Sequence, residues 1–315
     1  MSLHPQARAF LQQMEAIDAP ELHTVAVDVA RTMYDKGAEQ VRGEPPTPFA
    51  IDTLQIPGPA GALESWLYRP EDTPDLPLLV FFHGGGFTIG SLQSHDAVCR
   101  HLCVEAGCLV LSVDYRLGPE HRYPAAVDDA WAATRWALAN AAAIGADPQR
   151  IGVGGDSAGG NLAAVVCLQA REAGLDDLVL QLLIYPATDM SREHPSHSKF
   201  ASGYRLTREL IDWFYDNYVA PGADIHEWRA SPINAASHRG LPPAFVLSAG
   251  FDPLQDENKA YALKLEADGV PVTYRHYGDM FHGFITMPGV LDRAREALAE
   301  SAEALRGAFF CREPQ

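Results

Sequence analysis

The sequence predicts an α/β fold built on a mostly parallel central sheet of about eight strands with helices on both faces. From residue 76 onward, short and continuously apolar runs alternate with longer segments of helical periodicity. Buried parallel strands have this continuous apolar character because helices cover both faces of the sheet. The chain has 315 residues, of which 47% are hydrophobic and 21% charged, as in ordinary globular proteins. It can therefore bury a core large enough for such a sheet.

The N-terminal part of the chain is predicted to be helical. Apolar residues recur at helical spacing in residues 1–42, as the series Phe10, Met14, Ile17 illustrates. Three prolines in residues 43–49 end this helical region. Residues 52–58 and 63–70 then flank a turn of small residues, which predicts a β-hairpin.

The remaining elements follow the alternation of strands and helices. The predicted strands are residues 76–82, 108–115, 150–155, 179–185, 244–250 and 272–277. The predicted helices are residues 94–106, 125–143, 160–172, 256–268 and 289–308.

One segment interrupts this alternation. Residues 189–235 are polar, rich in aromatic side chains and predicted to be mostly helical, and they lie between two predicted strands. With residues 1–42, this insertion is expected to form a cap over a core made of residues 43–188 and 236–315. The alternative is a pair of packed surface helices that gate nothing.

The charge of the chain excludes several kinds of partner. With 24 basic and 41 acidic residues, the net charge is −17, which opposes binding to nucleic acids and to anionic membranes. No apolar run approaches the roughly 20 residues needed to span a bilayer. The first ten residues lack the pattern of a secretory signal. These features predict a cytoplasmic protein.

The cysteines support the same compartment. There are five, an odd number, which is typical of reduced thiols in the cytosol. Cys99 and Cys103 lie four residues apart, and His95 lies four residues before Cys99. Small buried core residues are the favoured interpretation of this group, ahead of a metal site.

A serine is the first candidate for chemistry. Residues Gly155–Gly159 form a G-x-S-x-G motif that follows a predicted strand and precedes a predicted helix. Ser157 would thus lie on a sharp strand-to-helix turn with its hydroxyl exposed above the sheet. A glycine-rich turn that only permits close packing is the alternative.

A serine nucleophile needs a base and a group that orients the base. Asp252 directly follows the predicted strand 244–250, and His282 follows the strand 272–277 after a short loop, residues 278–281. Reactive residues gather at the carboxyl ends of parallel strands, so Ser157, Asp252 and His282 are expected to meet there. Asp279 is a competitor for the role of Asp252, and His276 is interpreted as structural because it lies within a strand.

Acyl transfer also needs donors for a developing oxyanion. Residues 81–87 end a predicted strand with the sequence FFHGGGF, and successive glycines let backbone N–H groups approach a ligand. A phosphate-binding loop is the rival, but no Lys-Ser or Lys-Thr pair follows these glycines. His83 is expected to brace the loop through hydrogen bonds and to take no part in proton transfer.

Taken together, these motifs identify a family. The segments HGGGF, DYRLGPEHRYPAA, GDSAGG, DPLQDE and HGF stand in order along the chain, and together they resemble the hormone-sensitive-lipase family of bacterial esterases, in its GDSAG branch. The resemblance covers essentially the whole chain. It departs at Gly118, where the family usually has alanine.

The resemblance implies an α/β-hydrolase core beneath a helical cap, and a carboxylesterase that hydrolyses short- to medium-chain esters through an acyl-enzyme. Ser157 would be the nucleophile, His282 the base and Asp252 its orienting partner. The oxyanion hole would comprise Gly84, Gly85, Gly86 and Ala158. No metal or organic cofactor is required, and the expected partner is a small-molecule ester, with a homodimer as a further expectation. An amidase or peptidase, or a non-catalytic receptor on the same fold, is the alternative.

Overall fold

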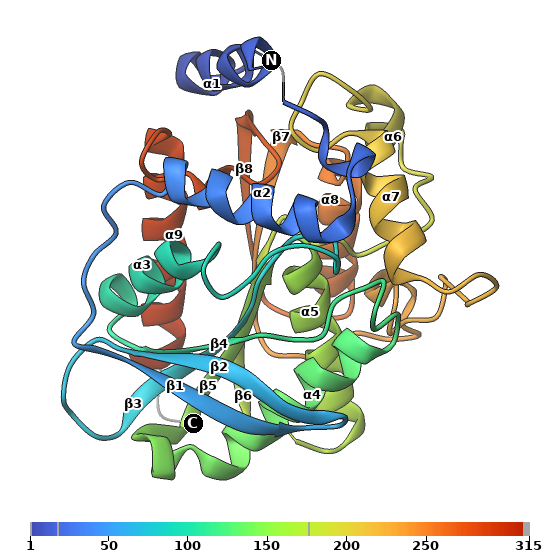
Figure 1. Ribbon diagram of the computed structural model, residues 1–315. Helices are drawn as coiled ribbons and strands as arrows, with labels where there is room; N and C mark the ends of the chain where they lie inside the picture. Colours follow the sequence, from blue (N-terminus) through green and yellow to red (C-terminus); the bar gives the residue numbers. More distant parts are fainter. Residues whose placement is uncertain (1, 18, 176, 311–315) are drawn as a thin grey trace.

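The computed structural model describes residues 2–17, 19–175 and 177–310. Within these residues, one sheet has eight strands in the order β1-β2-β4-β3-β5-β6-β7-β8 (Figure 1). The strands are β1 (Ala50–Gly58), β2 (Gly61–Arg69), β3 (Leu76–Phe82), β4 (Leu109–Val113), β5 (Ala146–Asp156), β6 (Leu178–Ile184), β7 (Ala244–Phe251) and β8 (Val272–Phe281). The predicted hairpin β1–β2 is antiparallel, β2 pairs antiparallel with β4, and the pairings from β4 to β8 are parallel.

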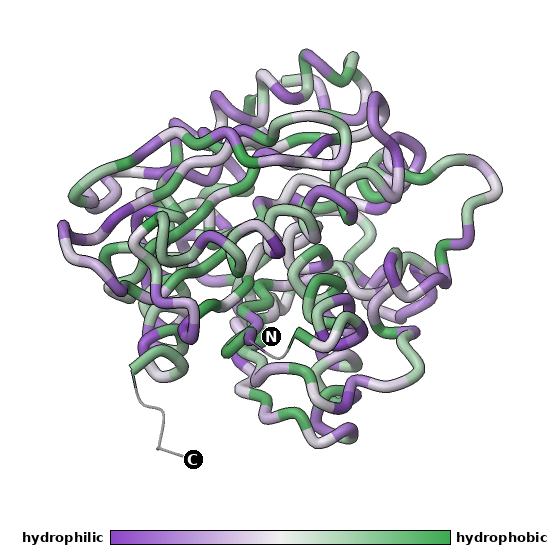
Figure 2. Tube along the Cα trace, turned by 90° about the horizontal axis from the view of Figure 1, so that it is seen from below, coloured by the Kyte–Doolittle hydropathy of each residue, from purple (hydrophilic) through white to green (hydrophobic). Residues whose placement is uncertain are grey.

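Helices cover both faces of the sheet, as predicted. The helices of the core are α3 (Asp96–Ala106), α4 (Ala125–Asn140), α5 (Ala158–Glu172), α8 (Gln255–Ala267) and α9 (Asp292–Phe310), with the short 3-10 turns η2 (Ala142–Ile144) and η4 (Phe284–Thr286). Apolar side chains of α4, α5 and α8 form one buried cluster, and those of α3 and α9 form a second. Figure 2 shows hydrophobic and hydrophilic residues alternating along the outer helices, as expected for helices with one buried face.

The N-terminal region departs from the single helical stretch predicted for residues 1–42. It contains α1 (Pro5–Ala16), the 3-10 turn η1 (Leu22–Thr24) and α2 (Val27–Val41). Pro20 accounts for the break, because proline has no backbone N–H and disfavours helical geometry at the residue before it. Helix α1 packs on the core, with the ring of Phe10 stacked 5.8 Å from that of Phe281 in β8.

The insertion between β6 and β7 contains α6 (Pro195–Lys199), α7 (Arg208–Tyr218) and the 3-10 turn η3 (Pro232–Asn234), joined by irregular segments. It is therefore less helical than predicted. Side chains of α2 and α7 meet in a small third apolar cluster that includes Ala30, Ile211 and Phe214. The two segments thus form a layer beside the carboxyl ends of the strands (Figure 1).

Two buried contacts fasten α6 to the core. The imidazole of His197 lies 2.9 Å from the carboxylate of Glu257 in α8, and both side chains are fully buried. The same carboxylate accepts the backbone N–H of Thr188 at 2.7 Å. The Ser196 hydroxyl donates to the carbonyl of Pro253 at 2.5 Å. The insertion is thereby held against the turn that follows β7.

Strand β8 is longer than predicted. Residues 278–281, expected to form a loop, continue the strand, and Phe281 pairs with Phe251 after a register shift in β7. Gly250 and Gly278 lie backbone to backbone at this irregularity, and a Cβ on Gly250 would collide with Gly278. The absence of side chains lets the two strands stay together to the end of β8, which carries His282 to its position.

Candidate active site

Ser157 lies at the sharp turn between β5 and α5. Its backbone has φ 54° and ψ −115°, a strained conformation for a residue with a side chain. Gly155 and Gly159 permit this turn, because a Cβ on either would collide with the backbone of Phe82 in β3. The local sequence thus raises the serine hydroxyl above the sheet, as the motif predicts.

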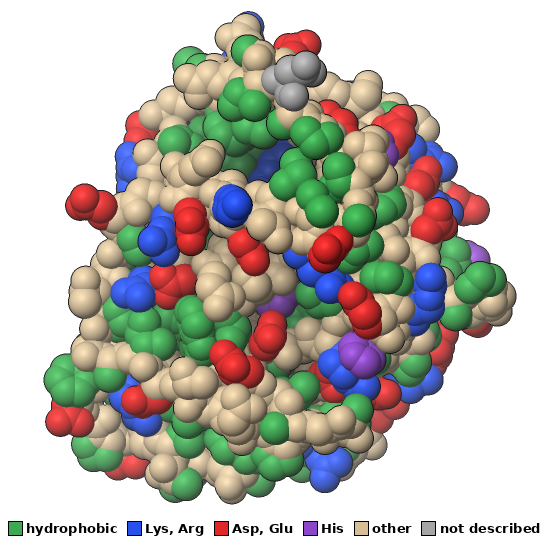
Figure 3. Space-filling view, viewed as in Figure 1, with side chains coloured by type: hydrophobic (Ala, Val, Ile, Leu, Met, Phe, Trp, Pro, Cys, Tyr) green, Lys and Arg blue, Asp and Glu red, His purple; other side chains and the backbone are tan. Residues whose placement is uncertain are grey.

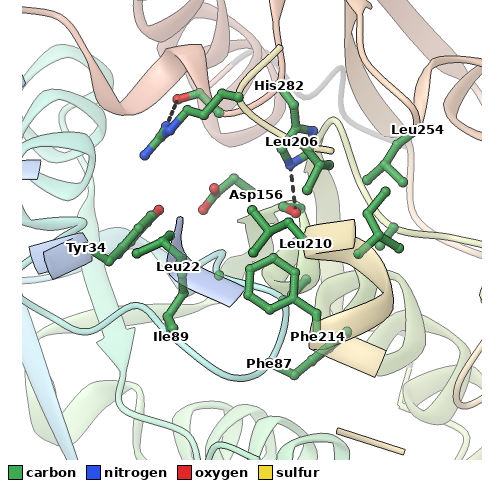
Figure 4. A pocket seen from close by; sticks show the side chains of 18 of the residues that line it. Leu22, Tyr34, Phe87, Ile89, Asp156, Leu206, Leu210, Phe214, Leu254 and His282 are labelled. Carbon is green, nitrogen blue, oxygen red and sulfur yellow. Dashed lines mark hydrogen bonds between the residues drawn. The ribbon is translucent and has the colours of Figure 1, made fainter. Parts of the chain in front are cut away.

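The three residues predicted to act together meet at the carboxyl ends of β5, β7 and β8. His282 Nε2 lies 2.9 Å from Ser157 Oγ, and His282 Nδ1 lies 2.7 Å from Asp252 Oδ2 (Figure 4). The other oxygen of Asp252 accepts the N–H of Leu254 at 2.8 Å. Asp252 is fully buried and His282 is 8% exposed. This chain of contacts has the geometry of a serine nucleophile, a base and an orienting carboxylate.

The competing side chains have other partners. Asp279 pairs with Arg293 at 3.2 Å, away from the imidazole of His282. His276 lies within β8 as expected, with its Nδ1 2.9 Å from the hydroxyl of Ser248.

Two glycines of the loop after β3 and the first residue of α5 present backbone N–H groups to the pocket. Gly85, Gly86 and Ala158 line it together with Ser157. Within the described chain, none of these three amides donates a backbone or side-chain hydrogen bond. Gly85 has φ +124° and Gly86 has φ +57°, conformations that L side chains rarely adopt. The three amides can therefore serve an oxyanion in front of the serine.

Gly84 does not join them. Its N–H donates to Asp156 Oδ1 at 2.8 Å and is buried, so this amide, which was expected in the oxyanion hole, is already engaged by a carboxylate. A carboxylate acceptor holds this amide more strongly than a neutral one would. Gly84 instead fixes the first residue of the loop to the turn that carries Ser157.

A buried network that sequence reasoning missed surrounds this contact. His95 Nε2 lies 3.1 Å from Asp156 Oδ1, and Ser94 Oγ lies 3.0 Å from His95 Nδ1. Burial raises the pKa of Asp156, but His95 and the N–H of Gly84 outweigh it and hold that pKa below its ordinary value. His95 carried no recognisable signal, because only the fold brings it next to the residue before the nucleophile.

His83 braces the loop, as expected. Its Nδ1 lies 2.8 Å from the carbonyl oxygen of Gly84, and the hydroxyl of Tyr115 donates to the carbonyl of His83 at 2.6 Å. Burial, helped by nearby His95, lowers the pKa of His83 to about 3. The imidazole is therefore neutral near pH 7 and can neither give nor take the proton of the reaction there.

The pocket in front of Ser157 is mostly apolar and has a cavity volume of about 100 Å³. Figure 4 shows Tyr34, Leu22 and Ile89 on one side of the contact between His282 and the serine, Leu254 on the other side, and Phe214 and Phe87 below it. Of the four aromatic residues at positions 213, 214, 215 and 218 of the insertion, only Phe214 and Tyr215 line it. The ring of Tyr218 instead stacks on Phe87, with ring centroids 4.0 Å apart.

Helix α2 is tied to the oxyanion loop by one arginine. Arg31 donates to the carbonyl oxygens of Thr88 and Gly118, each at 2.9 Å, and pairs with Glu120 at 2.7 Å. Thr88 and Ile89 in turn donate their N–H groups to the carbonyl of Gly85 at 3.1 and 2.9 Å. The N-terminal segment therefore supports the loop as well as lining the pocket.

Other features of the described residues concern metals, thiols and membranes. They contain no group of three or more His, Cys, Asp or Glu side chains placed to hold a metal ion. The four cysteines within the described ranges are unpaired and buried, and Cys311 lies outside the described residues. No helix among them has the length and apolar character needed to cross a bilayer.

Comparison with known proteins agrees with the geometry. Residues 79–286 match a protein family described as having the alpha/beta hydrolase fold. The chain is 49% identical over 243 residues to the carboxylic ester hydrolase LipN of Mycobacterium tuberculosis, covering 75% of this chain and 65% of that protein. It is 40% identical to the esterase LipI of the same organism, covering 92% and 95%. It is 38% identical to ethyl acetate hydrolase of Pseudomonas putida, covering 97% and 99%.

Solved structures show the same likeness over nearly the full chain. An ester hydrolase from the metagenome of Lake Arreo, solved with a derivative of bipyridine phosphonate, superposes with a TM-score of 0.95 at 43% identity. The match covers 98% of this chain and 99% of that one. A hyperthermophilic esterase from Pyrobaculum calidifontis gives a TM-score of 0.92 at 38% identity, with coverage of 98% and 99%. The chain therefore belongs to the α/β-hydrolase family of carboxylic ester hydrolases that resemble hormone-sensitive lipase.

Proposed function

We propose that the chain hydrolyses short- to medium-chain carboxylic esters at Ser157 through an acyl-enzyme. The observation that carries this proposal is the continuous contact from Ser157 to His282 to Asp252 beneath three free backbone amides. A receptor that only binds its ligand needs no such contact.

In the first half of the reaction, His282 takes the proton of Ser157 as the hydroxyl oxygen attacks the ester carbonyl. The amides of Gly85, Gly86 and Ala158 stabilise the negative charge on the carbonyl oxygen. Asp252 holds the imidazole in place and stabilises its protonated form, and His282 then protonates the leaving alcohol. In the second half, water deprotonated by the same imidazole releases the acid and restores Ser157.

The length of the acyl chain is limited by the cap, which we propose consists of residues 1–42 and 189–235. These two segments supply Leu22, Tyr34, Leu206, Leu210, Ile211, Phe214 and Tyr215 to the pocket. Apolar walls favour an alkyl chain, at about 0.8 kcal/mol for each buried methylene group, until the cavity ends. An amidase or peptidase on the same residues remains the second candidate, and the rates on matched esters and amides decide between them.

The test of the nucleophile is Ser157→Ala. The variant should fold normally and lose turnover of p-nitrophenyl butyrate by a factor on the order of 10⁶, the size of the loss seen in a serine protease. An organophosphate should label Ser157 stoichiometrically in the parent protein and nothing in the variant. Activity above about 1% of the parent, or labelling at another residue, would contradict the assignment.

The test of the base compares two histidines. His282→Ala should be nearly as damaging as loss of the serine, whereas His276→Ala should keep most of its activity because His276 contacts only Ser248 and Tyr274 within the described structure. Thermal unfolding of both variants controls for a loss of fold. Equal losses in the two variants would contradict the role given to His282.

We further propose a cytoplasmic location and a homodimer. The free cysteines support the location, since reduced thiols are typical of that compartment. Strand β8 lies at one edge of the sheet, so its outer backbone groups can pair with a second copy. Light scattering of the purified chain measures its oligomeric state.

A further inference from the structure

The pocket has one charged corner that the proposed reaction does not use. Arg205 comes from the segment between α6 and α7 and lines the pocket beside Tyr34, Asp156 and Gly283. Its guanidinium lies 5.5 Å above the ring of Tyr34 and donates one hydrogen bond, at 3.2 Å, to the carbonyl of Gly283. Gly283 directly follows the base His282, so the cation lies next to the reacting groups.

No carboxylate within the described part of the chain pairs with this cation. The nearest acidic group of the pocket, Asp156, is already engaged by His95 at 3.1 Å and by the N–H of Gly84 at 2.8 Å. Other arginines of the N-terminal segment and the insertion do have carboxylate partners: Arg31 pairs with Glu120, and Arg208 pairs with Asp212. A guanidinium has five N–H donors, so the carbonyl of Gly283 and the neighbouring hydroxyl of Tyr34 leave several of them open to a ligand.

Arg205 is half-buried, so its remaining donors are open to a ligand that enters the pocket, and a hydrogen bond from the charged guanidinium is stronger than a neutral one. Most of the remaining lining is apolar or aromatic, and it includes Leu206, Leu210, Phe214 and Leu254. Figure 4 shows Tyr34 on one side of the contact that His282 makes with the serine and Leu254 on the other. The pocket therefore has one charged corner, at Arg205, and mostly apolar walls elsewhere around Ser157.

We propose that Arg205 is a specificity-determining residue that binds an oxygen acceptor, a carboxylate or a second ester carbonyl, on one arm of the substrate. This inference rests on the proposed ester hydrolysis and names its substrate class: esters with an acceptor oxygen a few carbons from the scissile bond. The alkyl arm of such an ester lies in the apolar side of the pocket. Arg205 touches the substrate and takes no proton.

The experiment compares matched esters. In the first set, monoethyl and diethyl esters of succinic, glutaric and adipic acids are compared with ethyl esters of the corresponding monocarboxylic acids. In the second set, 4-acetoxybutanoate and its ethyl ester are compared with pentyl acetate. The two sets place the acceptor on the acyl arm and on the alcohol arm. The kcat/KM of each ester is measured by titration of the released acid.

Three variants accompany the parent protein. Arg205→Leu removes the donors and the charge but keeps apolar bulk, Arg205→Lys keeps the charge without the planar fork, and Arg208→Leu removes an exposed charge outside the pocket. Arg205→Leu should reduce the preference for the acceptor-bearing ester by a factor on the order of 10 to 100, the range for loss of a charge-assisted hydrogen bond. Its kcat/KM on plain alkyl esters should change by less than about threefold. Arg205→Lys should be intermediate, and Arg208→Leu should equal the parent.

The possible results distinguish the chemistry of the acceptor, the role of Arg205 and the ester-hydrolase function. A preference for half-esters alone identifies a carboxylate, and an equal preference for diesters identifies a neutral carbonyl. The proposal is overturned if the parent enzyme prefers neither kind of ester. It is also overturned if Arg205→Leu loses activity on all esters equally, because Arg205 would then act only through Gly283 on the position of His282. If the parent fails to hydrolyse even plain alkyl esters, the proposed ester hydrolysis itself is contradicted. This result differs from the two that overturn the role of Arg205, because in those the plain esters are still hydrolysed by the parent.

Discussion

Backbone geometry at single residues supports the reaction proposed for Ser157. The positive φ of Ser157 and the left-handed conformations of Gly85 and Gly86 place a hydroxyl and three N–H groups around one point. Such conformations cost free energy and persist only where surrounding contacts enforce them. Here the enforcing contacts are the bonds from Gly84 to Asp156 and from Ile89 to Gly85.

His83 gives a prediction for stability against pH. Its pKa is about 3 in the folded protein and about 6.5 in an unfolded chain. Because the unfolded state binds the proton more readily, this histidine stabilises the fold fully above about pH 6.5, and the contribution is lost as the pH falls toward 3. Between pH 7 and pH 5 the loss is about 2 kcal/mol of the free energy of unfolding.

His83→Gln should therefore lose about 2 kcal/mol less than the parent protein over that interval, measured by urea unfolding at the two pH values. His276→Gln, at an exposed histidine of β8, is the control for a general effect of removing an imidazole. If the parent and His83→Gln lose stability in parallel, His83 binds its proton as readily in the fold as in the unfolded chain, and the argument fails.

At the scale of elements, we expect α7 to limit the length of the substrate. Phe214 reaches so close to Gly86 that a Cβ on that glycine would collide with its ring. The ring therefore lies directly over the oxyanion loop and ends one side of the pocket. Trp213, the preceding residue of the same helix, contacts Phe214 but does not line the pocket.

Phe214→Ala should move the optimum of a p-nitrophenyl ester series to longer acyl chains, by two or more methylene groups, while Trp213→Ala leaves the optimum unchanged. We expect the parent optimum between acetate and octanoate. The ratio of kcat/KM for each ester to that for butyrate cancels any common loss of folded protein. An unchanged optimum in Phe214→Ala would show that another wall ends the pocket.

Elements also show what could be predicted from the sequence. The strands and core helices were predictable because buried strands are continuously apolar and each element ends at glycine, proline or polar residues. The break at Pro20 and the extension of β8 were missed, since the first lay inside an apolar periodicity and the second depends on close contact between Gly250 and Gly278. Ser157, Asp252 and His282 were predictable because each follows a strand. The contact of His95 with Asp156 and the unpaired state of Arg205 were not, since they depend on side chains far apart in the chain.

At the scale of the whole molecule, charge predicts where the enzyme meets its substrate. The net charge is −17, and the face in Figure 3 shows acidic and basic side chains interspersed among hydrophobic ones. A strongly acidic protein is repelled by anionic lipid surfaces. It is therefore expected to act on dispersed esters.

The rate on a p-nitrophenyl ester should accordingly follow the dispersed concentration and show no jump when the substrate forms micelles. Adding vesicles of anionic lipid should not raise it, and vesicles of neutral lipid serve as the control. A jump at the onset of micelles, or an optimum at dodecanoate or longer, would mean that the cap opens to a lipid phase.

The hydrogen bonds of Arg31 give the N-terminal segment a second role, which is to support the loop that carries Gly85 and Gly86. A protein shortened by residues 1–42 would keep Ser157, His282 and Asp252, yet it would lose the side chain that holds Thr88 and Gly118. The loop that presents Gly85 and Gly86 would then have lost its outer brace. Removal of residues 1–42 should therefore lower the rate without changing a reacting atom, and trimming the N-terminus to widen the substrate range should lower the rate as well as the selectivity.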